Sequence, residues 1–341
     1  MTQSPRVSVV CPFFNEESVI VPATKQMIAT LDRDFGGDWE LILVNDGSHD
    51  ASLQRLLDLA AGQGAPRLRV LTFPFNQGRG RAIKAGIDAA TGAIIVTTEV
   101  DGSWGEAIVR QMVDELDRHP ESDFVIASPH RDGGGLENVP FKRVMLTRIG
   151  NLLIRAFFGS GVTMNTGMTR AYRNAVIKPL VVHADGKEFH LEVLLKLITI
   201  GFRFREVPAT ITWNRFQAPA KARRSSTKIR ETIASHLKFL TIARPVRYFV
   251  AFAIVTGVLS AAFLAAAVAM FITKIAPAIY LALTGLSLVL MALVFIGFAV
   301  LFSETREAMR TELIQLYPPP HPPAARAARE VFPPRAGPTV S

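Results

Sequence analysis

Two carboxylate side chains, Glu99 and Asp101, follow the apolar run at 94–98. In an extended segment, side chains separated by one residue point to the same side and can act on one ligand. Carboxylate oxygens are hard ligands that suit Mg²⁺ or Mn²⁺ held jointly with the phosphates of a substrate. The pair therefore predicts a metal site, and for this motif alone a solvated acidic turn remains the alternative.

Two other turns with carboxylates follow the apolar runs at 7–10 and 41–44. The first reads Cys-Pro-Phe-Phe-Asn-Glu-Glu and supplies Glu16, and the second reads Asn-Asp-Gly-Ser and supplies Asp46. Either carboxylate can accept a hydrogen bond from a base or a ribose. Taken singly these signals are weak, because Asn-Asp-Gly-Ser also reads as an ordinary turn.

A glycine-rich segment at 76–86 precedes and opens a predicted helix. A helix N-terminus of this kind suits phosphate, because its first backbone N–H groups have no partner within the helix. The segment is no dinucleotide fingerprint, since Ile83 stands where the third glycine belongs, and no Gly-Lys-Ser/Thr of a Walker loop follows. We expect phosphate contacts from Asn76, Gly78, Gly80 and Lys84.

The elements that position these turns alternate between strand and helix. Apolar, β-rich runs predict strands, and helical periodicity predicts the segments between them. The predicted strands are 7–10, 41–44, 68–72 and 94–98, and the predicted helices are 17–33, 51–61 and 79–90. This order predicts an α/β fold with a mostly parallel sheet and helices on both faces, whose ligands sit at the carboxyl ends of the strands.

Composition adds a membrane part to this domain. The 341 residues are 49% apolar, and the segments 249–272 and 278–302 contain no charged residue. Each is long enough to cross a hydrocarbon core of about 30 Å, so we predict two transmembrane helices; two buried helices of a soluble protein are the alternative. Basic residues flank the outer ends of the pair, which predicts that both termini and the catalytic domain face the cytoplasm. These residues are Lys238, Arg244, Arg247, Arg306 and Arg310, against Lys274 alone in the connection.

The beginning of the chain and its cysteine content agree with a cytoplasmic location. No basic segment followed by an apolar stretch opens the sequence, so a cleaved signal peptide is not expected. Cys11 is the single cysteine and has no partner for an intramolecular disulfide. The net charge of +9 is concentrated at 142–155 and 221–247, next to apolar periodicity and the predicted spans. We therefore expect lipid headgroups and phosphates as partners, and no nucleic acid.

The chain accordingly divides into four parts. We predict a cytoplasmic catalytic domain at 1–220, a basic amphipathic juxtamembrane segment at 221–247, the two spans at 248–303 and a largely disordered tail at 304–341, which is rich in Pro, Ala and Arg. Within the first part, 137–159 has an amphipathic pattern that predicts a helix in the lipid interface. A helix packed on the soluble core fits that pattern equally well.

Taken together, the motifs resemble the family-2 glycosyltransferases with the GT-A fold, and within them the polyprenyl-phosphate group typified by dolichol-phosphate mannose synthase. The resemblance covers roughly residues 6–240. Glu99-Val-Asp101 stands at the Asp-x-Asp metal site with Glu for the first Asp, and Thr-Gly-Met-Thr-Arg-Ala-Tyr-Arg at 166–173 is similar to the family's Thr-Gly-Ser-Phe-Arg-x-Tyr-Arg. Glu206-Val-Pro208 is followed by Arg215 and Lys221, as in the family, with one extra residue inserted.

The resemblance implies roles for single residues. It implies a nucleotide-sugar donor site, a catalytic Asp101 with Arg215 and Lys221 on the phosphates, and a metal ion, Mg²⁺ or Mn²⁺, on Glu99 and Asp101. We assign the lipid phosphate to Arg148, Arg155 and Arg170. The donor site is expected to contain Pro12, Phe14, Glu16, Asp46, Gly47, Asn76, Gly78, Gly80 and Lys84.

The implied reaction is a metal-dependent, inverting transfer of a sugar to a polyprenyl phosphate. The lipid phosphate attacks the anomeric carbon and nucleoside diphosphate leaves. Two alternatives remain open: the same fold with another lipid acceptor, and a membrane-tethered nucleotide-sugar binder without catalysis, since Phe14, Glu99 and Met164 depart from the family pattern. The chain is also a possible homo-oligomer.

Overall fold

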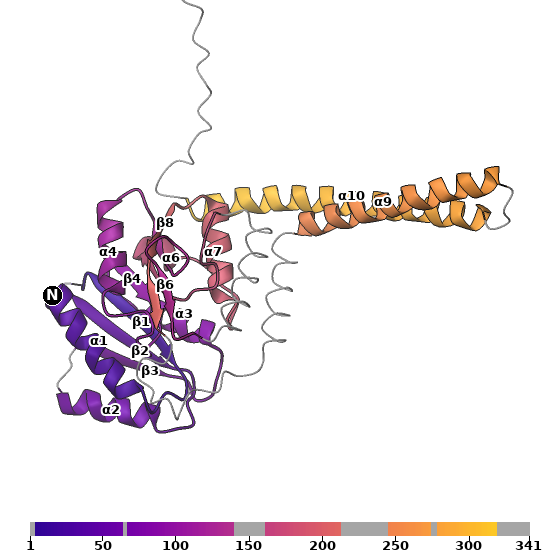
Figure 1. Ribbon diagram of the computed structural model, residues 1–341. Coiled ribbons are helices and arrows are strands. Elements are labelled where there is room, and N and C mark those ends of the chain that lie inside the picture. Colours follow the sequence, from indigo (N-terminus) through magenta and orange to yellow (C-terminus); the bar gives the residue numbers. More distant parts are fainter. Residues whose placement is uncertain (1–3, 64–66, 140–160, 213–244, 274–277, 319–341) are drawn as a thin grey trace, which may run out of the picture.

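The computed structural model describes residues 4–63, 67–139, 161–212, 245–273 and 278–318, and it combines an α/β domain with a pair of long helices (Figure 1). The elements of the α/β domain are, in chain order, β1 (Val7–Phe13), α1 (Ile20–Phe35), β2 (Trp39–Asn45), α2 (Ser52–Gln63), β3 (Leu68–Thr72), α3 (Arg79–Ala89), β4 (Ile94–Thr97), α4 (Ile108–Arg118), β5 (Phe124–Ser128), β6 (Gly135–Glu137), β7 (Arg170–Arg173), α6 (Asn174–Ile177), α7 (Phe189–Ile200), β8 (Phe204–Pro208) and β9 (Thr210–Thr212).

Seven of these strands form one sheet in the order β3-β2-β1-β4-β7-β5-β8. All neighbours are parallel except β7, which runs antiparallel to both β4 and β5. Every residue of β1 and β2 is buried, as expected for parallel strands covered on both faces. The prediction of a mostly parallel sheet is confirmed, and the four strands and three helices predicted from the sequence are present.

Helices cover both faces of the sheet, as the alternation of side chains along β1 shows. Val10 lies on the face of α3, where a side chain added at Gly86 would meet it. Its neighbour Cys11 lies on the opposite face, where its Sγ is 3.8 Å from Met27 Sδ of α1. Successive residues of a strand point to opposite faces, so α1 and α3 must sandwich the sheet.

A second, small sheet pairs β6 with β9, and this pairing corrects one predicted boundary. Gly135 to Glu137 pair in parallel with Thr210 to Thr212. The interfacial helix expected at 137–159 therefore does not begin at 137, because Glu137 is a strand residue. The part of that prediction beyond residue 139 lies outside the described residues.

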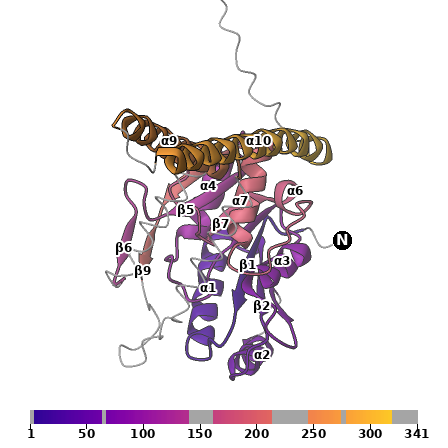
Figure 2. The same cartoon turned by 90° about the vertical axis from the view of Figure 1, so that its right-hand side faces the viewer.

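Two helices, α9 (Pro245–Ile272) and α10 (Ala278–Leu316), are long and apolar enough to cross a membrane. They pack side by side, and Figures 1 and 2 show the C-terminal end of α10 beside α7 at the edge of the α/β domain. Gly285 allows close contact, since its carbonyl accepts a hydrogen bond from Ser260 Oγ at 2.8 Å and a side chain there would collide with Leu264. These helices contain the two spans predicted from the sequence.

The second of these helices corrects the predicted tail. A largely disordered tail was expected at 304–341, but α10 continues as helix to Leu316. Leu313, Ile314 and Tyr317 pack against the core of the α/β domain, and α10 contacts α7. The segment 304–316 contains five charged residues, so its continuity with the apolar part of α10 and this packing favour the helix. The first part of the predicted tail is therefore helical, while 319–341 lies outside the described residues.

Candidate active site

The carboxyl ends of β1, β2 and β4 bring three of the predicted motifs to one edge of the sheet. β1 lies between the other two strands, with Phe13 opposite Asn45 and Val10 opposite Thr97. The loops that follow these strands carry Glu16, Asp46 and the Glu99-Val-Asp101 motif. The sheet topology thus gathers residues that are more than 80 positions apart in the sequence.

Within the loop after β4, Ser103 connects the two carboxylates. Its backbone N–H donates to Asp101 Oδ1 at 3.0 Å, and its hydroxyl donates to Glu99 Oε2 at 3.0 Å. The indole N–H of Trp104 donates to the same Glu99 oxygen at 3.1 Å. Glu99 Oε1 accepts neither bond, and among the described residues its nearest cation is Arg79, with Nη1 at 3.8 Å. The loop therefore fixes one oxygen of Glu99 and leaves the other toward Arg79.

The carboxylate of Asp101 is close enough to influence the ionisation of Glu99. Partial burial and, next, the negative charge of Asp101 raise the pKa of Glu99. Arg79 and the two hydrogen bonds from Ser103 and Trp104 act in the opposite direction. An unneutralised pair of this kind attracts a cation.

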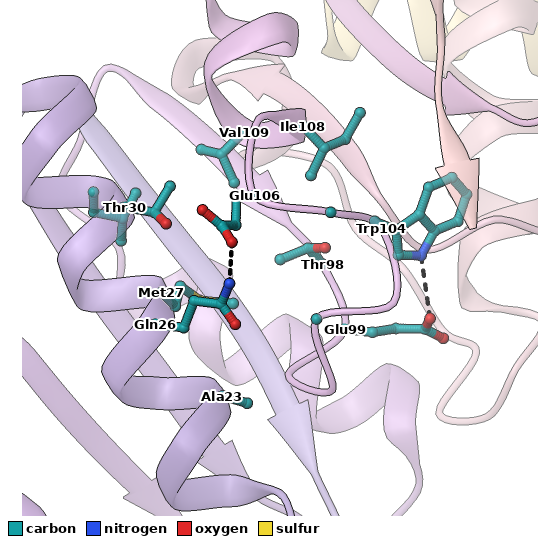
Figure 3. A pocket seen from close by; sticks show the side chains of 13 residues that line it. Ala23, Gln26, Met27, Thr30, Thr98, Glu99, Trp104, Glu106, Ile108 and Val109 are labelled. Atoms are coloured by element: carbon teal, nitrogen blue, oxygen red, sulfur yellow. Dashed lines mark hydrogen bonds between the residues drawn. The ribbon is translucent and has the colours of Figure 1, made fainter. Parts of the chain in front are cut away.

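Trp104 lines two spaces. Glu99 lines the first of them, which Figure 3 shows. The first is a cavity of about 40 Å³ between α1 and the loop after β4, closed by a hydrogen bond from Gln26 to Glu106. The second is an open groove of about 630 Å³, which ends against β9 and the residues near Pro208. The cavity admits no more than water-sized groups, whereas the groove is large enough for a sugar or a headgroup.

Hydrogen bonds join the loops after β1 and β2. Asn15 N–H donates to Ser48 Oγ at 3.0 Å, and His49 N–H donates to Asn15 Oδ1 at 2.9 Å. The ring of Phe14 meets the ring of His49 edge to face, with centroids 6.0 Å apart. Of the predicted residues here, Pro12 lies within β1, and Glu16 is buried with its backbone N–H bonded to Ser52 Oγ.

Asp46 organises the neighbouring loop and is 3% exposed. Its carboxylate accepts hydrogen bonds from Gln77 N–H at 2.8 Å, from Gly78 N–H at 3.2 Å and from Asn76 Nδ2 at 3.0 Å. Burial raises the pKa of Asp46, and these bonds act against that rise. The oxygens of Asp46 thus hold residues 76–78, and its contact to a base or ribose stays a prediction.

The start of α3 also differs from its predicted role as a phosphate site. The N–H groups of Gly80 and Arg81 donate to the carbonyl of Asp185, at 2.7 and 3.2 Å. A side chain at Gly78 would lie 2.4 Å from the same carbonyl oxygen, so the glycine allows the segment around 185 to approach. Lys84 donates to the carbonyl of Val182 at 3.3 Å. The chain itself thus occupies the amides that were expected to bind phosphate.

Gly47 is required where the loops after β2 and β3 touch. Its φ is +69°, and a Cβ would lie 2.2 Å from the backbone carbon of Phe75. We expect Gly47→Ala to lower the stability of the domain by on the order of 3 kcal/mol, from overpacking and the positive φ together. Thermal unfolding measures this. Gly62→Ala in α2 is the matched control, with open space around it, and should leave the melting temperature unchanged or slightly higher.

Arg170 corrects the predicted lipid-phosphate site. It pairs with Thr97 across β7 and β4, and its side chain is fully buried. Its terminal nitrogens donate to the carbonyls of His190 and Asn165, both at 2.7 Å. Because both terminal nitrogens of Arg170 are bound to carbonyls in the core, its guanidinium is not presented to a lipid. The other predicted basic residues, Arg148, Arg155, Arg215 and Lys221, lie outside the described residues.

The sequence reasoning missed three residues of the site: Arg79, Ser103 and Trp104. Arg79 stands within the glycine-rich segment, and in the part of the chain that the structure describes it is the cation nearest to Glu99. Ser103 and Trp104 lie two and three residues after Asp101. These two hydrogen-bond donors lie in the same loop as the two acids, so proximity in the sequence alone could have suggested their contact with the carboxylates.

The α/β domain is similar in fold to a solved structure. Glucosyl-3-phosphoglycerate synthase of Mycobacterium tuberculosis, in complex with phosphoglyceric acid, superposes with a TM-score of 0.51 at 21% identity, over 69% of this chain and 79% of that one. At this identity the similarity shows a shared fold.

Two curated relatives are closer in sequence. A dodecaprenyl-phosphate galacturonate synthase of Rhizobium johnstonii is 31% identical over 55% of this chain and 53% of its own length. A polyprenol monophosphomannose synthase of Mycolicibacterium smegmatis is 29% identical over 50% of this chain and 66% of its own length. In both cases less than two thirds of the relative's length is matched.

The family assignment rests on a separate match, to the family as a whole. The description Glycosyl transferase family 2 fits residues 8–181, which is just over half of the chain. This range includes β1 to β4, their loops and the carboxylate pair. The chain belongs to glycosyl transferase family 2.

Proposed function

We propose that the protein transfers a sugar from a nucleotide-sugar donor to the phosphate of a polyprenyl phosphate in the membrane. The observation that carries the proposal is the position of Glu99 and Asp101 at the carboxyl end of β4, in a family 2 domain that packs against a pair of membrane-length helices. The names of the two curated relatives, one a dodecaprenyl-phosphate and the other a polyprenol-phosphate sugar synthase, support the acceptor class.

The donor would lie across the loops after β1, β2 and β4. The joined loops around Phe14 and Asp46 offer a wall for the nucleoside, and Arg79 supplies positive charge beside the carboxylates. Its side chain is about one third exposed, so a diphosphate can reach it. Arg215 and Lys221 remain proposed contacts to the phosphates, by the family resemblance. Positive charge placed where the leaving diphosphate develops negative charge stabilises the transition state, and this is usually the largest single contribution to catalysis in such a site.

A divalent cation fits the carboxylate pair. Among the residues that the structure describes, no three His, Cys, Asp or Glu side chains gather closely enough to bind a metal by themselves. Two carboxylates with free oxygens suit Mg²⁺ or Mn²⁺ that takes its remaining ligands from substrate phosphates and water. A structural neighbour with a TM-score of 0.50, again the Mycobacterium tuberculosis enzyme, contains Mn²⁺ together with UDP. Bound there, the cation would neutralise the charge that grows on the leaving diphosphate.

The transfer itself would be one displacement. A phosphate oxygen of the lipid attacks the anomeric carbon, the bond from that carbon to the nucleoside diphosphate breaks, and the configuration inverts. The groove of about 630 Å³ beside Trp104 is a suitable entrance for the headgroup. Arg148 and Arg155 remain proposed contacts to the lipid phosphate or to anionic headgroups, whereas Arg170 is excluded by its burial.

Membrane insertion would place the active site at the depth of the acceptor's phosphate. The docked end of α10 ties the catalytic domain to the spans, and the basic residues outside the pair favour a cytoplasmic orientation for this side. The same orientation puts the nucleotide sugar and both flanks of the helix pair in the cytoplasm.

The experiment that tests the function uses the full chain in lipid nanodiscs. UDP- and GDP-sugars would be supplied with undecaprenyl phosphate and Mn²⁺, the lipid product read by mass spectrometry and the released nucleoside diphosphate counted. One diphosphate for each glycosyl lipid is the expected result. Binding of donor without release would indicate a binder, and release with another lipid only would indicate a different acceptor; either contradicts the proposal.

A further inference from the structure

Glu99 is longer than the aspartate that the resembled motif has at this position, and its extra torsion has to be fixed for the carboxylate to act as a ligand. Ordering a free glutamate side chain costs conformational entropy of up to about 2 kcal/mol. In the structure one oxygen, Oε2, is bound by two donors, the Ser103 hydroxyl at 3.0 Å and the Trp104 indole at 3.1 Å. Oε1 receives neither and lies 3.8 Å from Arg79 Nη1. Figure 3 shows the indole bond to Glu99.

The two donors are themselves held in place. Trp104 is 6% exposed and belongs to the hydrophobic core, so its indole N–H points in a fixed direction. The backbone N–H of Ser103 is bound to Asp101, which fixes Ser103 relative to the second carboxylate. The loop closes tightly because Gly102 and Gly105 both have positive φ, 65° and 76°. Each donor thus belongs to a loop with little freedom.

We propose that Trp104, assisted by Ser103, is the positioning residue that makes Glu99 a competent metal ligand, by binding Oε2 and leaving Oε1 for the cation. The inference rests on the proposed metal-dependent function and concerns how this chain uses glutamate there. Hydrogen-bond donors behind a carboxylate ligand orient it, and their loss typically weakens metal binding by about 10- to 100-fold. These two hydrogen bonds to Oε2, which we call the tether, also explain why glutamate can replace the shorter aspartate: they set how far the carboxylate extends.

The test measures Mn²⁺ affinity of the full-length protein in detergent, from the electron paramagnetic resonance signal of free Mn²⁺, with UDP and separately with GDP present. Trp104→Phe keeps the ring and removes the N–H donor. We expect its dissociation constant for Mn²⁺ to rise about ten-fold, and that of Trp104→Phe with Ser103→Ala to rise further. An unchanged constant in Trp104→Phe would overturn the proposal.

Two controls separate positioning from a general structural effect. Trp39→Phe removes a similar indole bond, from Nε1 to Asp32 at 3.0 Å, on a buried tryptophan in β2, and should leave Mn²⁺ binding unchanged. In the Glu99→Asp background the shorter carboxylate no longer reaches the indole, so adding Trp104→Phe should change the constant less than two-fold. Equal effects of Trp104→Phe in both backgrounds would show that Trp104 acts on the fold and would overturn the tether.

The same measurement distinguishes failure of the inference from failure of the proposed function. If the wild-type protein binds Mn²⁺ neither in the presence of UDP nor in the presence of GDP, the metal site is contradicted, and with it the positioning of Glu99 by Trp104. Wild-type binding together with an unaffected Trp104→Phe overturns the tether alone. Melting temperatures within a few degrees of wild type confirm that each variant is folded when its Mn²⁺ affinity is read.

Discussion

Asp101→Asn should reduce sugar transfer by at least about 100-fold while the protein stays folded. The change removes an anionic oxygen that the proposed function uses as a metal ligand and alters the side-chain volume little. The melting temperature in the absence of divalent cations should not fall, because the charge of Asp101 opposes that of Glu99 and its removal relieves this repulsion. Release of nucleoside diphosphate at saturating Mn²⁺ measures the first effect, and thermal unfolding measures the second.

A matched control and a neighbouring series sharpen this result. Asp88→Asn removes an exposed carboxylate from α3, outside the site, and should retain wild-type turnover. Glu99→Asp, which keeps the charge, should retain more activity than Glu99→Gln, which keeps the length. Turnover near wild type in Asp101→Asn would contradict the metal assignment, and equal losses in both Glu99 variants would mean that the reach of the carboxylate matters as much as its charge.

The first half of the fold could be predicted from the sequence because its signals are local. The strands around Val9, Leu43 and Ile95 are short apolar runs, and the helices between them show helical periodicity. The later elements give weaker signals: β7 is only four residues long and runs antiparallel between two parallel strands. Its place depends on pairing with β4 and β5, which lie far away in the sequence, so no local pattern indicates it.

The candidate site was predicted in part, for a related reason. The carboxylates Glu99 and Asp101 were found because acids after a buried strand are conspicuous. The direction of a side chain is not visible in the sequence, and Arg170 shows the consequence: a basic residue in a family motif was expected at the lipid, yet the register of β7 turns it into the core, where two carbonyls satisfy it. Asp46 was expected to face the donor, and its carboxylate binds the backbone N–H groups of Gln77 and Gly78 and the side-chain amide of Asn76.

Activity should depend on the phosphate of the acceptor and on no protein residue that removes a proton. Transfer of a sugar to an alcohol usually needs a carboxylate or histidine as general base, because an alcohol is a weak nucleophile. A phosphate monoester has a second pKa of about 6 and is largely dianionic at neutral pH. We therefore expect glycosylation of undecaprenyl phosphate and none of undecaprenol under the same conditions, with products read by mass spectrometry.

The pH profile provides an independent check of the same mechanism. Below about pH 6 the lipid phosphate takes up a proton and loses nucleophilicity, so the rate should fall on the acid side with the titration of the lipid. The carboxylates add to this fall, since the raised pKa of Glu99 brings its protonation, and the loss of its affinity for a cation, to a higher pH than for an ordinary glutamate. Raising the Mn²⁺ concentration should restore the part of the rate that is lost through protonation of Glu99. It should not restore the part that is lost through protonation of the lipid phosphate. Measurable product from undecaprenol would contradict the mechanism, as would a further carboxylate, outside Glu16, Asp46, Glu99 and Asp101, whose removal abolishes turnover without changing donor or Mn²⁺ binding.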